Sequence, residues 1–468
     1  ATLLRLQRYR GHLYNWYDTR TLVPLTPGYI STVDSGNLAG YLLTLRAGLA
    51  GLSEQTPVIT ASFLDGLDDL VNLFEEEVAR VAVDGKTAAG KSRALKKEVA
   101  TLRQRIRERP TTLRQWKSLM SQIHDGVAAV GVLLLDLEEP LLTSAGATPV
   151  GPTTVTEAGY WLDQLAHTVA DRQQEFDRLV PWADRDEQST VPSLAALLAN
   201  DESRHHASEL LDRAERLSAL ADDFIEETEF DFLFNEDRQL FSIGFNVSDG
   251  RLDPSYYDTL ASEARLASFV AIATGKISHE HWFKLGRSLT PAGTSRALLS
   301  WSASMFEYLM PLLVMRAYPG TLLAETHAAV VRQQIQYGAR RGVPWGISES
   351  AYNIQDLDGN YQYRAFGVPG LGLKRGLADD LVVAPYASLL AAPLEPEAVV
   401  NNLAHLHSEG MAGRYGFYES IDYTVDRLPP SATGGAVLPT YMAHHQGMIL
   451  LAVDNALHDS PMQRRFHA

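Results

Sequence analysis

The stretch Tyr256-Tyr-Asp-Thr-Leu-Ala-Ser-Glu-Ala-Arg-Leu-Ala-Ser-Phe-Val-Ala-Ile-Ala-Thr274 is apolar almost throughout. Its only charged residues are Asp258, Glu263 and Arg265. A helix that is apolar almost all round is buried on every side, so this pattern predicts an inner helix over 256–274. Glu263 and Arg265 lie two positions apart and do not share a helix face, so they are not a simple surface pair.

Helical periodicity continues on both sides of this stretch. It predicts an amphipathic helix at 1–17 and a second helix that begins near Asp34 or Ser35, either of which can cap it. Further helices are predicted at 57–83, 89–108, 111–138, 153–181, 192–227, 294–317, 320–341, 376–391, 396–409 and 439–457. The segments 232–234 and 240–245, with a polar turn between them, predict a β-hairpin. Paired helices separated by irregular loops predict an all-α fold in which helical hairpins close into a ring.

The composition limits the classes of function. The chain has 468 residues, 45% of them apolar, which is enough for a sizeable core. Its 41 Lys and Arg residues against 57 Asp and Glu give a net charge of −16, which disfavours a nucleic-acid partner. The absence of cysteine excludes disulfides, thiolate metal sites and a cysteine nucleophile.

Two features bear on the setting of the chain. The longest continuous apolar run, 127–135, is far shorter than the ~18 residues that span a bilayer, so we expect no membrane contact. The sequence begins at Ala1, without an initiator methionine and inside a predicted helix. We therefore expect a segment of a longer protein.

The loop Val343-Pro-Trp-Gly-Ile-Ser-Glu-Ser-Ala-Tyr-Asn353 places Glu349 close to Trp345. Sugar rings stack on aromatic faces, and a glycosidic bond breaks only when an acid protonates the departing oxygen. The loop therefore predicts a carbohydrate-cleaving site. A second loop, 415–423, places Glu419 and Asp422 among aromatic residues, where they can hold sugar hydroxyls, although Asp422 can also cap a turn.

Two other carboxylates occupy apolar helical patterns. Glu263 is either catalytic or a buried structural residue with a partner on a neighbouring helix. Glu307 either faces a polar cavity or binds neighbouring backbone groups. No metal or cofactor is predicted. The pairs His279/His281 and His444/His445 lack the spacing of helical metal ligands, and His205-His206 lies on a charged helix.

Eight motifs together resemble a known family. They are Gly11-His-Leu-Tyr-Asn-Trp-Tyr-Asp-Thr-Arg20, Ser31-Thr-Val-Asp-Ser-Gly-Asn-Leu-Ala-Gly40, Asp253-Pro-Ser-Tyr-Tyr257, Ser262-Glu-Ala-Arg-Leu-Ala-Ser-Phe269, Phe306-Glu-Tyr-Leu-Met-Pro311, Trp345-Gly-Ile-Ser-Glu-Ser350, Phe366-Gly-Val-Pro-Gly-Leu-Gly372 and Tyr441-Met-Ala-His-His-Gln-Gly447. They look like the central glucoamylase-like domain of cyclic β-1,2-glucan synthases, which is related to endo-β-1,2-glucanases. The likeness spans nearly the whole chain and is loose over 54–226.

The resemblance implies an (α/α)6 toroid that binds β-1,2-linked glucan and needs no cofactor. In such synthases this domain cuts a linear chain and rejoins it as a ring, a retaining transglycosylation, whereas a hydrolase of the same family shortens the chain. By position, Glu263 and Glu349 are the implied catalytic carboxylates, with Glu307 and Glu419 as candidates for a catalytic or supporting role. A synthase also implies a cytoplasmic location, a membrane-bound glycosyltransferase region before this domain and a phosphorylase-like region after it.

The predicted domains are the start of the helical barrel at 1–53, a long-helix accessory region at 54–227, and the main barrel with the catalytic loops and the β-hairpin at 228–468. The predicted substrate-binding residues are aromatic groups that stack on sugars and polar groups that contact hydroxyls. The stacking residues are Trp16, Tyr17, Trp345, Tyr361, Tyr363, Phe366, Tyr415 and Tyr418. The polar residues are Asp18, Arg20, Asp34, Arg364, Lys374, Arg375, Asp422, His444, His445 and Gln446.

Two rival functions remain open. A phosphorylase of similar ring shape needs a basic phosphate pocket, for which Lys374-Arg375 and His444-His445 are the candidates. A non-catalytic glucan-binding or scaffold domain would use the same carboxylates only to hold sugar hydroxyls.

Overall fold

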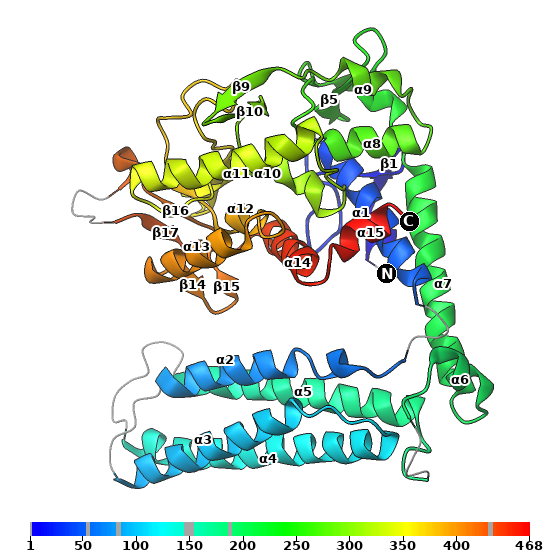
Figure 1. Ribbon diagram of the computed structural model, residues 1–468, viewed down its shortest axis with the longest axis vertical. Coiled ribbons are helices and arrows are strands. Elements are labelled where there is room, and N and C mark those ends of the chain that lie inside the picture. The colour runs from blue at the N-terminus through cyan, green and yellow to red at the C-terminus, as the bar shows by residue number, and fades with distance from the viewer. Residues whose placement is uncertain (1, 53–56, 81–85, 145–153, 186–189, 429–433) are drawn as a thin grey trace. The chain divides into compact units, whose positions relative to one another are not determined.

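The computed structural model describes residues 2–52, 57–80, 86–144, 154–185, 190–428 and 434–468 (Figure 1). The chain divides into two compact units. The larger unit consists of Ala1–Ala50 and Leu217–Ala468, and the smaller unit of Gly51–Arg216. The predicted assignment of 1–53, 54–227 and 228–468 to barrel and accessory regions stays a prediction.

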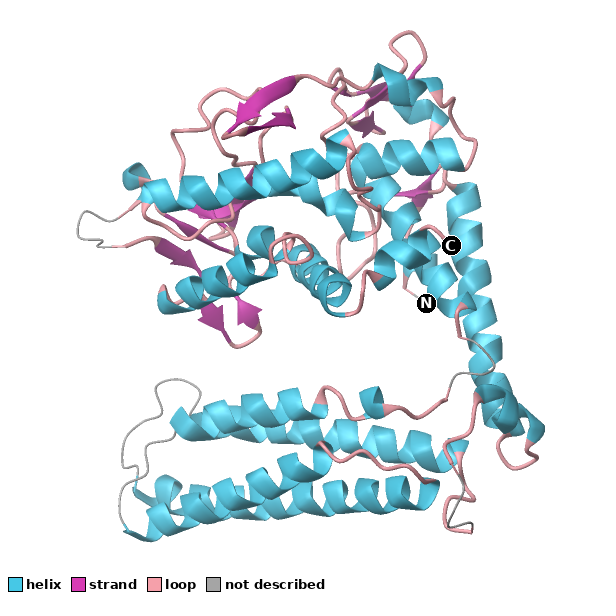
Figure 2. Cartoon of the chain, in the orientation of Figure 1, coloured by secondary structure: helices cyan, strands magenta, loops and turns pink. Residues whose placement is uncertain are grey.

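The smaller unit is a helical bundle. Its long helices α2 to α5 pack side by side (Figure 2). Their inward-facing Leu, Val, Phe and Trp residues form one core. The helices are α2 Leu67–Arg80, α3 Lys86–Ile106, α4 Leu113–Ser144, α5 Thr154–Leu179, α6 Leu194–Ala199 and the first part of α7 Arg204–Glu227. The predicted helix at 57–83 begins later, after a 3-10 turn at Ala61–Phe63, and the one at 192–227 is divided into α6 and α7.

One window of α4 bears on the membrane prediction. Within the described residues, Leu113–Leu137 alone is long and apolar enough to cross a membrane by length and composition. A core helix of a folded domain passes the same test, and Leu113, Met120 and Ile123 are buried in the bundle. The window is a weak indication, and the expected lack of membrane contact stays a prediction.

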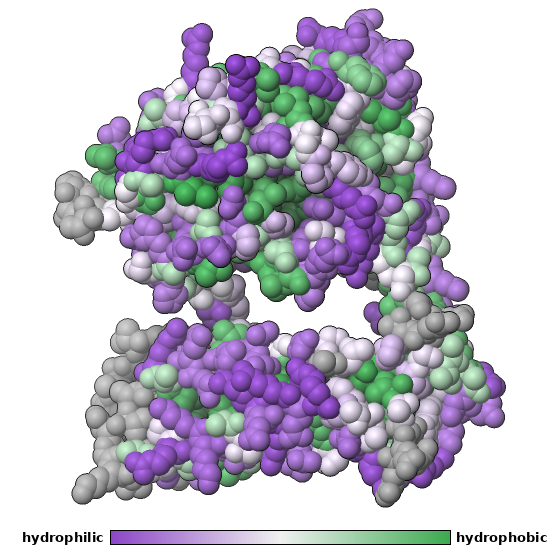
Figure 3. All heavy atoms as spheres, in the orientation of Figure 1, coloured by the Kyte–Doolittle hydropathy of each residue, from purple (hydrophilic) through white to green (hydrophobic). Residues whose placement is uncertain are grey.

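The larger unit is also rich in helices. Its helices pack as a series in which α8 contacts α1, α1 contacts α15, α15 contacts α14, α14 contacts α12, and α12 contacts α13. They are α1 Thr32–Ala50, α8 Arg265–Ala273, α9 Glu280–Lys284, α10 Met305–Leu309, α11 Leu322–Arg341, α12 Pro385–Leu389, α13 Pro396–Ser408, α14 Ala443–Leu457 and α15 Pro461–Phe466. Hydrophilic residues cover most of the face drawn in Figure 3, consistent with an apolar interior.

Short antiparallel sheets join these helices, and they go beyond the one predicted hairpin. The strand orders are β1-β2, β3-β6-β7, β4-β5-β8, β9-β10, β11-β12, β13-β16-β17 and β14-β15. The strands are β1 Arg8–Tyr9, β2 His12–Leu13, β3 Tyr29–Ser31, β4 Phe234–Asn235, β5 Leu240–Ser242, β6 Gly244–Asn246, β7 Arg251–Leu252, β8 Tyr256–Tyr257, β9 Leu289–Ala292, β10 Ser295–Leu298, β11 Ser350–Gln355, β12 Tyr361–Arg364, β13 Val382–Val383, β14 Ala412–Gly413, β15 Gly416–Phe417, β16 Ser420–Asp422 and β17 Ala436–Leu438. The predicted hairpin is confirmed, because β4 pairs with β5.

The predicted helix at 256–274 is wrong in its first half. Tyr256 and Tyr257 form β8 and pair with β5, and α8 begins only at Arg265. The aromatic pair gains sheet hydrogen bonds there, while the apolar run that follows keeps the buried helix. Glu263 consequently lies in the turn before α8 and not within a helix.

The predicted helix at 1–17 is also wrong. Gly11 has a positive φ of 82° and turns the chain between β1 and β2. The helix predicted at 294–317 gives way to β10, α10 and a 3-10 turn, and the one at 376–391 to β13 and α12. The predictions at 320–341 and 396–409 are confirmed by α11 and α13.

A close contact fixes α1 against α8. A Cβ atom on Gly36 would lie 2.2 Å from the Cβ of Ala267 and 2.3 Å from its Cα. We expect Gly36→Ala to destabilise the larger unit by about 1–3 kcal/mol, because the helices must separate. Equilibrium urea unfolding measures this.

Gly48→Ala is the matched control on α1. The three atoms nearest to its Cβ would belong to the Arg465 side chain, at 3.4 Å or more, and alanine favours a helix over glycine. We expect no loss of stability from it. Equal effects of the two substitutions would contradict the close packing at Gly36.

Candidate active site

Four carboxylates from distant parts of the chain come together in the larger unit. Asp34 lies in the first turn of α1, Glu263 precedes α8, Glu307 lies in the first turn of α10, and Glu349 precedes β11. They are near enough for their charges to repel one another, since Glu307, Glu349 and Asp34 all raise the pKa of Glu263. The two predicted catalytic carboxylates therefore share one region.

Glu263 has a half-buried side chain with an unusual environment. Its Oε2 atom is buried, and no hydrogen-bond partner for it lies among the described residues. Burial and then the charges of Glu307 and Glu349 raise the pKa of this carboxyl well above its usual value. Arg265 does not neutralise it, because the guanidinium donates to the carbonyl oxygens of Leu260 and Tyr308 at 3.2 and 3.4 Å. The structural alternative, a partner on a neighbouring helix, is not found among these residues.

Glu349 is held differently. Burial and the neighbouring Glu307 raise its pKa to about 7, while a hydrogen bond from Tyr363 and the charge of Lys374 act in the opposite direction. The Tyr363 hydroxyl lies 3.2 Å from Glu349 Oε1. A carboxyl group with a pKa near 7 can change protonation state at neutral pH.

Glu307 binds the backbone. It forms a capping box with Ser304, and both its carboxylate oxygens accept from the Ser302 backbone N–H at 3.0 Å. Of the two alternatives for Glu307, the structure shows the one in which the carboxylate binds neighbouring backbone groups. Its charge still acts on Glu263 and Glu349.

Asp422 is fully buried in an ion pair. Arg427 donates to its two oxygens at 2.6 and 3.0 Å, and the backbone N–H groups of Asn353 and Thr424 add bonds of 3.0 and 2.9 Å. These bonds occupy the Asp422 carboxylate and do not support its predicted contact with sugar. They support its alternative role in a turn. Glu419, also buried, accepts from His445 Nδ1 at 2.9 Å.

The predicted aromatic surface divides by exposure. Trp16, Tyr363 and Tyr415 are 71%, 40% and 57% exposed, and Tyr17, Tyr361 and Tyr418 are half-buried. Trp345 and Phe366 are 7% and 3% exposed and belong to the hydrophobic core, so their rings offer almost no face to a sugar.

Two aromatic residues near the carboxylates were missed. Tyr257 lies beside them, because Glu263, Asp34 and Glu349 all raise the pKa of its hydroxyl. Trp301, 46% exposed, donates from Nε1 to Asp258 at 2.9 Å. Tyr257 stood in a quoted motif, but the sequence does not tell which side chains of a motif face the carboxylates.

The predicted polar residues have mixed environments. The Asp18 carboxylate accepts hydrogen bonds from the nearby backbone N–H groups of Arg20 and Thr21. Gln446 donates to the Phe417 carbonyl at 3.4 Å. Asp34, Arg20 and His444 are exposed.

A cavity of about 380 Å³ contains the predicted basic groups. It is lined by Arg364, Ala365, Phe366, Gly367, Lys374, Arg375, Gly376, Leu377, Asp379, Asp380, Thr424, Asp426 and Arg427. Arg364 and Arg427 are both paired with Asp380. Lys374, one of the phosphate candidates, donates to the Ala365 carbonyl at 2.8 Å, so the phosphorylase alternative stays open.

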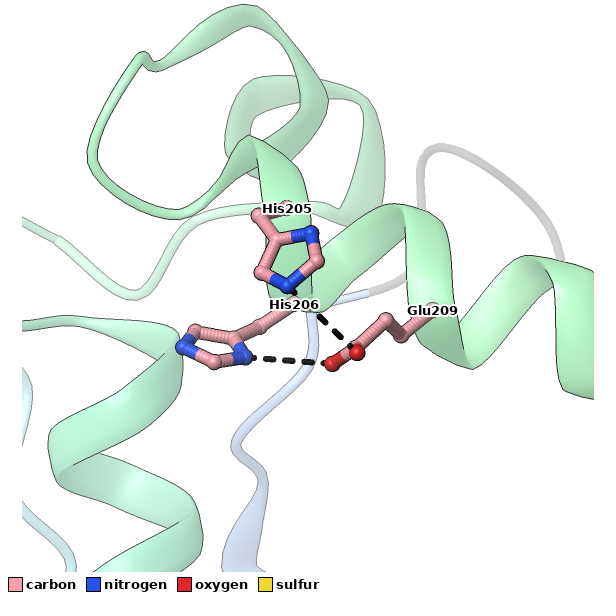
Figure 4. Close-up of side chains that lie close together, drawn as sticks. All are labelled: His205, His206 and Glu209. Carbon is pink, nitrogen blue, oxygen red and sulfur yellow. Dashed lines mark hydrogen bonds and ion pairs between the residues drawn. The ribbon is translucent and has the colours of Figure 1, made fainter.

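A cluster of candidate metal ligands lies elsewhere, in the smaller unit. Glu209 pairs with His205 Nε2 at 3.4 Å and with His206 Nδ1 at 3.3 Å (Figure 4). Their ligand atoms all lie within 4.8 Å of one another, but His205 is exposed, and no other observation on the described residues indicates an ion. The expected independence from metals and cofactors stays a prediction.

Comparisons with known proteins relate this geometry to a family. Residues 255–468 match the family model "Glycoamylase: Putative glucoamylase". Glu263, Glu307, Glu349, Glu419 and His445 all lie within the residues of this Glycoamylase match.

The relatives extend the similarity to the whole chain. The chain is 39% identical over 469 residues to the cyclic β-(1,2)-glucan synthase NdvB of Rhizobium meliloti (strain 1021), of which it spans 15%. Two solved structures of an endo-β-1,2-glucanase from Talaromyces funiculosus, with β-1,2-glucan and with sophorose, align at TM-scores of 0.41 and identities of 14% and 15%. Each alignment covers 67% of this chain and 72% of the glucanase. These scores indicate only a loose overall similarity.

Proposed function

We propose that the larger unit is a glycoside hydrolase or transglycosylase that cleaves β-1,2-glucosidic bonds in linear β-1,2-glucan, using Glu263 and Glu349. The observation that carries this proposal is the convergence of these two half-buried carboxyl groups, both with raised pKa values. The 39% sequence identity between the whole chain and a segment of NdvB supports β-1,2-glucan as the substrate class.

The two carboxyl groups have different environments, which supports different roles. Glu263 has a buried oxygen with no partner among the described residues and a pKa raised well above its usual value, so it retains a proton that it can donate to the leaving oxygen. Glu349 receives the Tyr363 hydrogen bond and lies near Lys374, both of which favour its ionised form. We therefore assign Glu263 as the acid and Glu349 as the nucleophile or base.

The reaction has two outcomes that share the first cleavage. If Glu349 attacks the anomeric carbon, the carbon–oxygen bond breaks as Glu263 protonates the leaving oxygen, and a glucosyl ester forms. A sugar hydroxyl or water then displaces Glu349 and returns a proton to Glu263. A carboxylate separation of about 5–5.5 Å accompanies this retaining route, and about 6.5–9.5 Å accompanies inversion by water.

The remaining assignments belong to the same proposal. The consecutive contacts of α8, α1, α15, α14, α12 and α13 support an (α/α)6 toroid. Exposed Trp16 and Tyr415 would bind the glucan, with Trp301 added to them. Since the chain spans 15% of NdvB, we also propose that it acts beside further synthase regions, in which case its location is cytoplasmic.

Activity is expected to be bell-shaped in pH. Ionised Glu349 is the active form, so kcat/KM should fall about tenfold per pH unit below its pKa of about 7. The alkaline limb should lie above this value, where Glu263 loses its proton. The two limbs belong to the interacting pair and not to either residue alone. Initial rates from pH 5 to 9 measure both limbs, and an acid limb near 4.5 would contradict the proposed environment of Glu349.

The function is tested with linear glucans of β-1,2, β-1,3, β-1,4 and α-1,4 linkage, with and without inorganic phosphate. We expect cleavage of the β-1,2-glucan alone, at the same rate in phosphate-free buffer. A strict phosphate requirement would instead favour the phosphorylase alternative. Binding without cleavage of any glucan would favour a scaffold domain.

A further inference from the structure

We infer that Tyr363, His445 and Glu419 form a hydrogen-bonded chain that ends on Glu349 and holds this carboxylate ionised and oriented for attack. The inference rests on the proposed role of Glu349. It makes all three positioning residues, which differs from the sugar contacts expected of Tyr363 and His445.

The inner end of the chain is a buried ion pair. His445 on α14 and Glu419, which precedes β16, each have side chains only 1% exposed, with Nδ1 and Oε1 2.9 Å apart. The Ala351 backbone N–H donates to the same Glu419 oxygen at 3.4 Å. Because both side chains are closed to solvent, neither can contact a glucan directly.

The His445 ring is fixed by stacking. The Tyr386 ring lies parallel to it, with centroids 3.6 Å apart and planes inclined by 14°. The Tyr386 hydroxyl lies 2.8 Å from the Glu349 carbonyl oxygen and 2.8 Å from Ser348 Oγ. One aromatic residue thus links the imidazole to the backbone of the reacting carboxylate.

Tyr363 on β12 completes the chain. Its hydroxyl lies 3.2 Å from Glu349 Oε1 and 3.3 Å from His445 Nε2. A hydroxyl has one proton and two lone pairs, so it donates to one neighbour while it accepts from the other. It can therefore transmit the protonation state of one end of the chain to the other.

The proton positions follow from this pattern of donors and acceptors. Ionised Glu419 is an acceptor only, so His445 Nδ1 carries a proton. When Glu349 is ionised, Tyr363 donates to it, and His445 Nε2 then donates to the Tyr363 oxygen. When Glu349 is protonated, both bonds reverse.

One proton moves between these two states. The Glu349 O–H bond breaks as its proton passes to the Tyr363 oxygen, and the tyrosine O–H bond breaks as its own proton forms an N–H bond at Nε2. The negative charge of Glu419 stabilises the resulting imidazolium. The pair therefore favours ionised Glu349.

Several titratable or charged groups surround the two ends of the hydrogen-bonded chain. The groups near His445 are Glu419, Tyr363, Tyr386 and His444. The groups near Glu349 are Tyr363, Tyr386, Glu263, Glu307, Asp34 and Lys374. Because the charges of Glu307 and Asp34 repel an ionised Glu349, its ionised form needs an opposing contribution. The chain through Tyr363 supplies one.

The test is the pH profile of kcat/KM for β-1,2-glucan cleavage in Tyr363→Phe and Glu419→Gln. We expect the acid limb to rise by about one pH unit in each variant. In Tyr363→Phe, ionised Glu349 loses a charge-assisted hydrogen bond. In Glu419→Gln, the imidazolium of His445 loses the negative charge that stabilises it. The KM should change less than kcat. Tyr363 is 40% exposed, so its variant should fold even if the buried Glu419 variant does not.

A double-variant cycle tests the connection. If His445 acts through Tyr363, His445→Gln should move the acid limb in the unmodified protein but not in the Tyr363→Phe background. Additive shifts would overturn the inference, as would an unmoved acid limb in Tyr363→Phe.

Matched controls separate this inference from the proposed function. His281 is as buried as His445, and within the described residues its ring nitrogens bond to Gln239 O and Ser268 Oγ, so His281→Gln should lower stability without moving the acid limb. If Glu349→Gln remains fully active, the proposed function fails. If Glu349→Gln is inactive while Tyr363→Phe and Glu419→Gln keep the unmodified profile, only the hydrogen-bonded chain fails.

Discussion

Glu349→Gln is expected to lower the kcat for linear β-1,2-glucan by about 10³-fold or more. The amide can neither attack the anomeric carbon nor remove a proton from water. The same change should stabilise the protein by about 2 kcal/mol at pH 8, because it removes a charge that burial and Glu307 disfavour. Product assays and urea unfolding of the same preparation measure the two effects.

The sign of the stability effect depends on pH. The pKa of Glu349 is higher in the folded state than in the unfolded chain, so its ionisation above about pH 7 costs folding energy. The advantage of Glu349→Gln should therefore be present at pH 8 and absent below about pH 4.5. A loss of activity accompanied by a loss of stability would indicate a damaged fold.

Glu263→Gln should lose turnover to a similar extent, because the amide has no proton of sufficient acidity for the leaving oxygen. Glu325→Gln, an exposed carboxylate in the first turn of α11, is the matched control and should keep full turnover. Full turnover by both Glu263→Gln and Glu349→Gln would exclude these two residues as the catalytic pair.

Arg427→Met is expected to destabilise the larger unit by about 3–5 kcal/mol. Arg427 donates twice to Asp422, whose side chain is fully buried, and its Nη1 lies 2.5 Å from Asp380. Methionine keeps an apolar chain of similar length but leaves Asp422 buried without its cation. Urea unfolding at pH 7 measures the loss.

Arg464→Met provides the comparison. Its partner Asp459 is 99% exposed, and exposed pairs contribute only about 0–1 kcal/mol. If Arg427→Met cost no more than Arg464→Met, the Asp422 ion pair would not be a major source of stability. The pair matters for the site because Asp422 also receives the backbone N–H of Asn353, four residues after Glu349.

The sequence predicted long continuous helices better than short elements. The ends of α11 and α13 were close to their predicted positions because Thr321 caps one and Glu395-Pro396 begins the other. The prediction failed at 256–274, where pairing of Tyr256–Tyr257 with β5 overrides the helical pattern. Such pairing depends on strands distant in sequence, which helical periodicity does not detect.

The same limit applies to the site. Glu263 and Glu349 stood out because each is an acidic residue in an apolar or aromatic setting. That pattern cannot separate a stacking aromatic residue from a core one, and Trp345 and Phe366 proved to be core residues. The hydrogen-bonded chain from Glu349 to Glu419 joins four separate segments, so its connections could not be read from local spacing.

The most direct test of the central claim is product analysis after incubation of the purified protein with linear β-1,2-glucan in phosphate-free buffer. Mass spectrometry and NMR would score shortened, rearranged and cyclic chains. We expect at least one of these products to form, and none to form with Glu263→Gln or Glu349→Gln. Glucan that is bound but recovered with its original length and linkage would contradict the central claim.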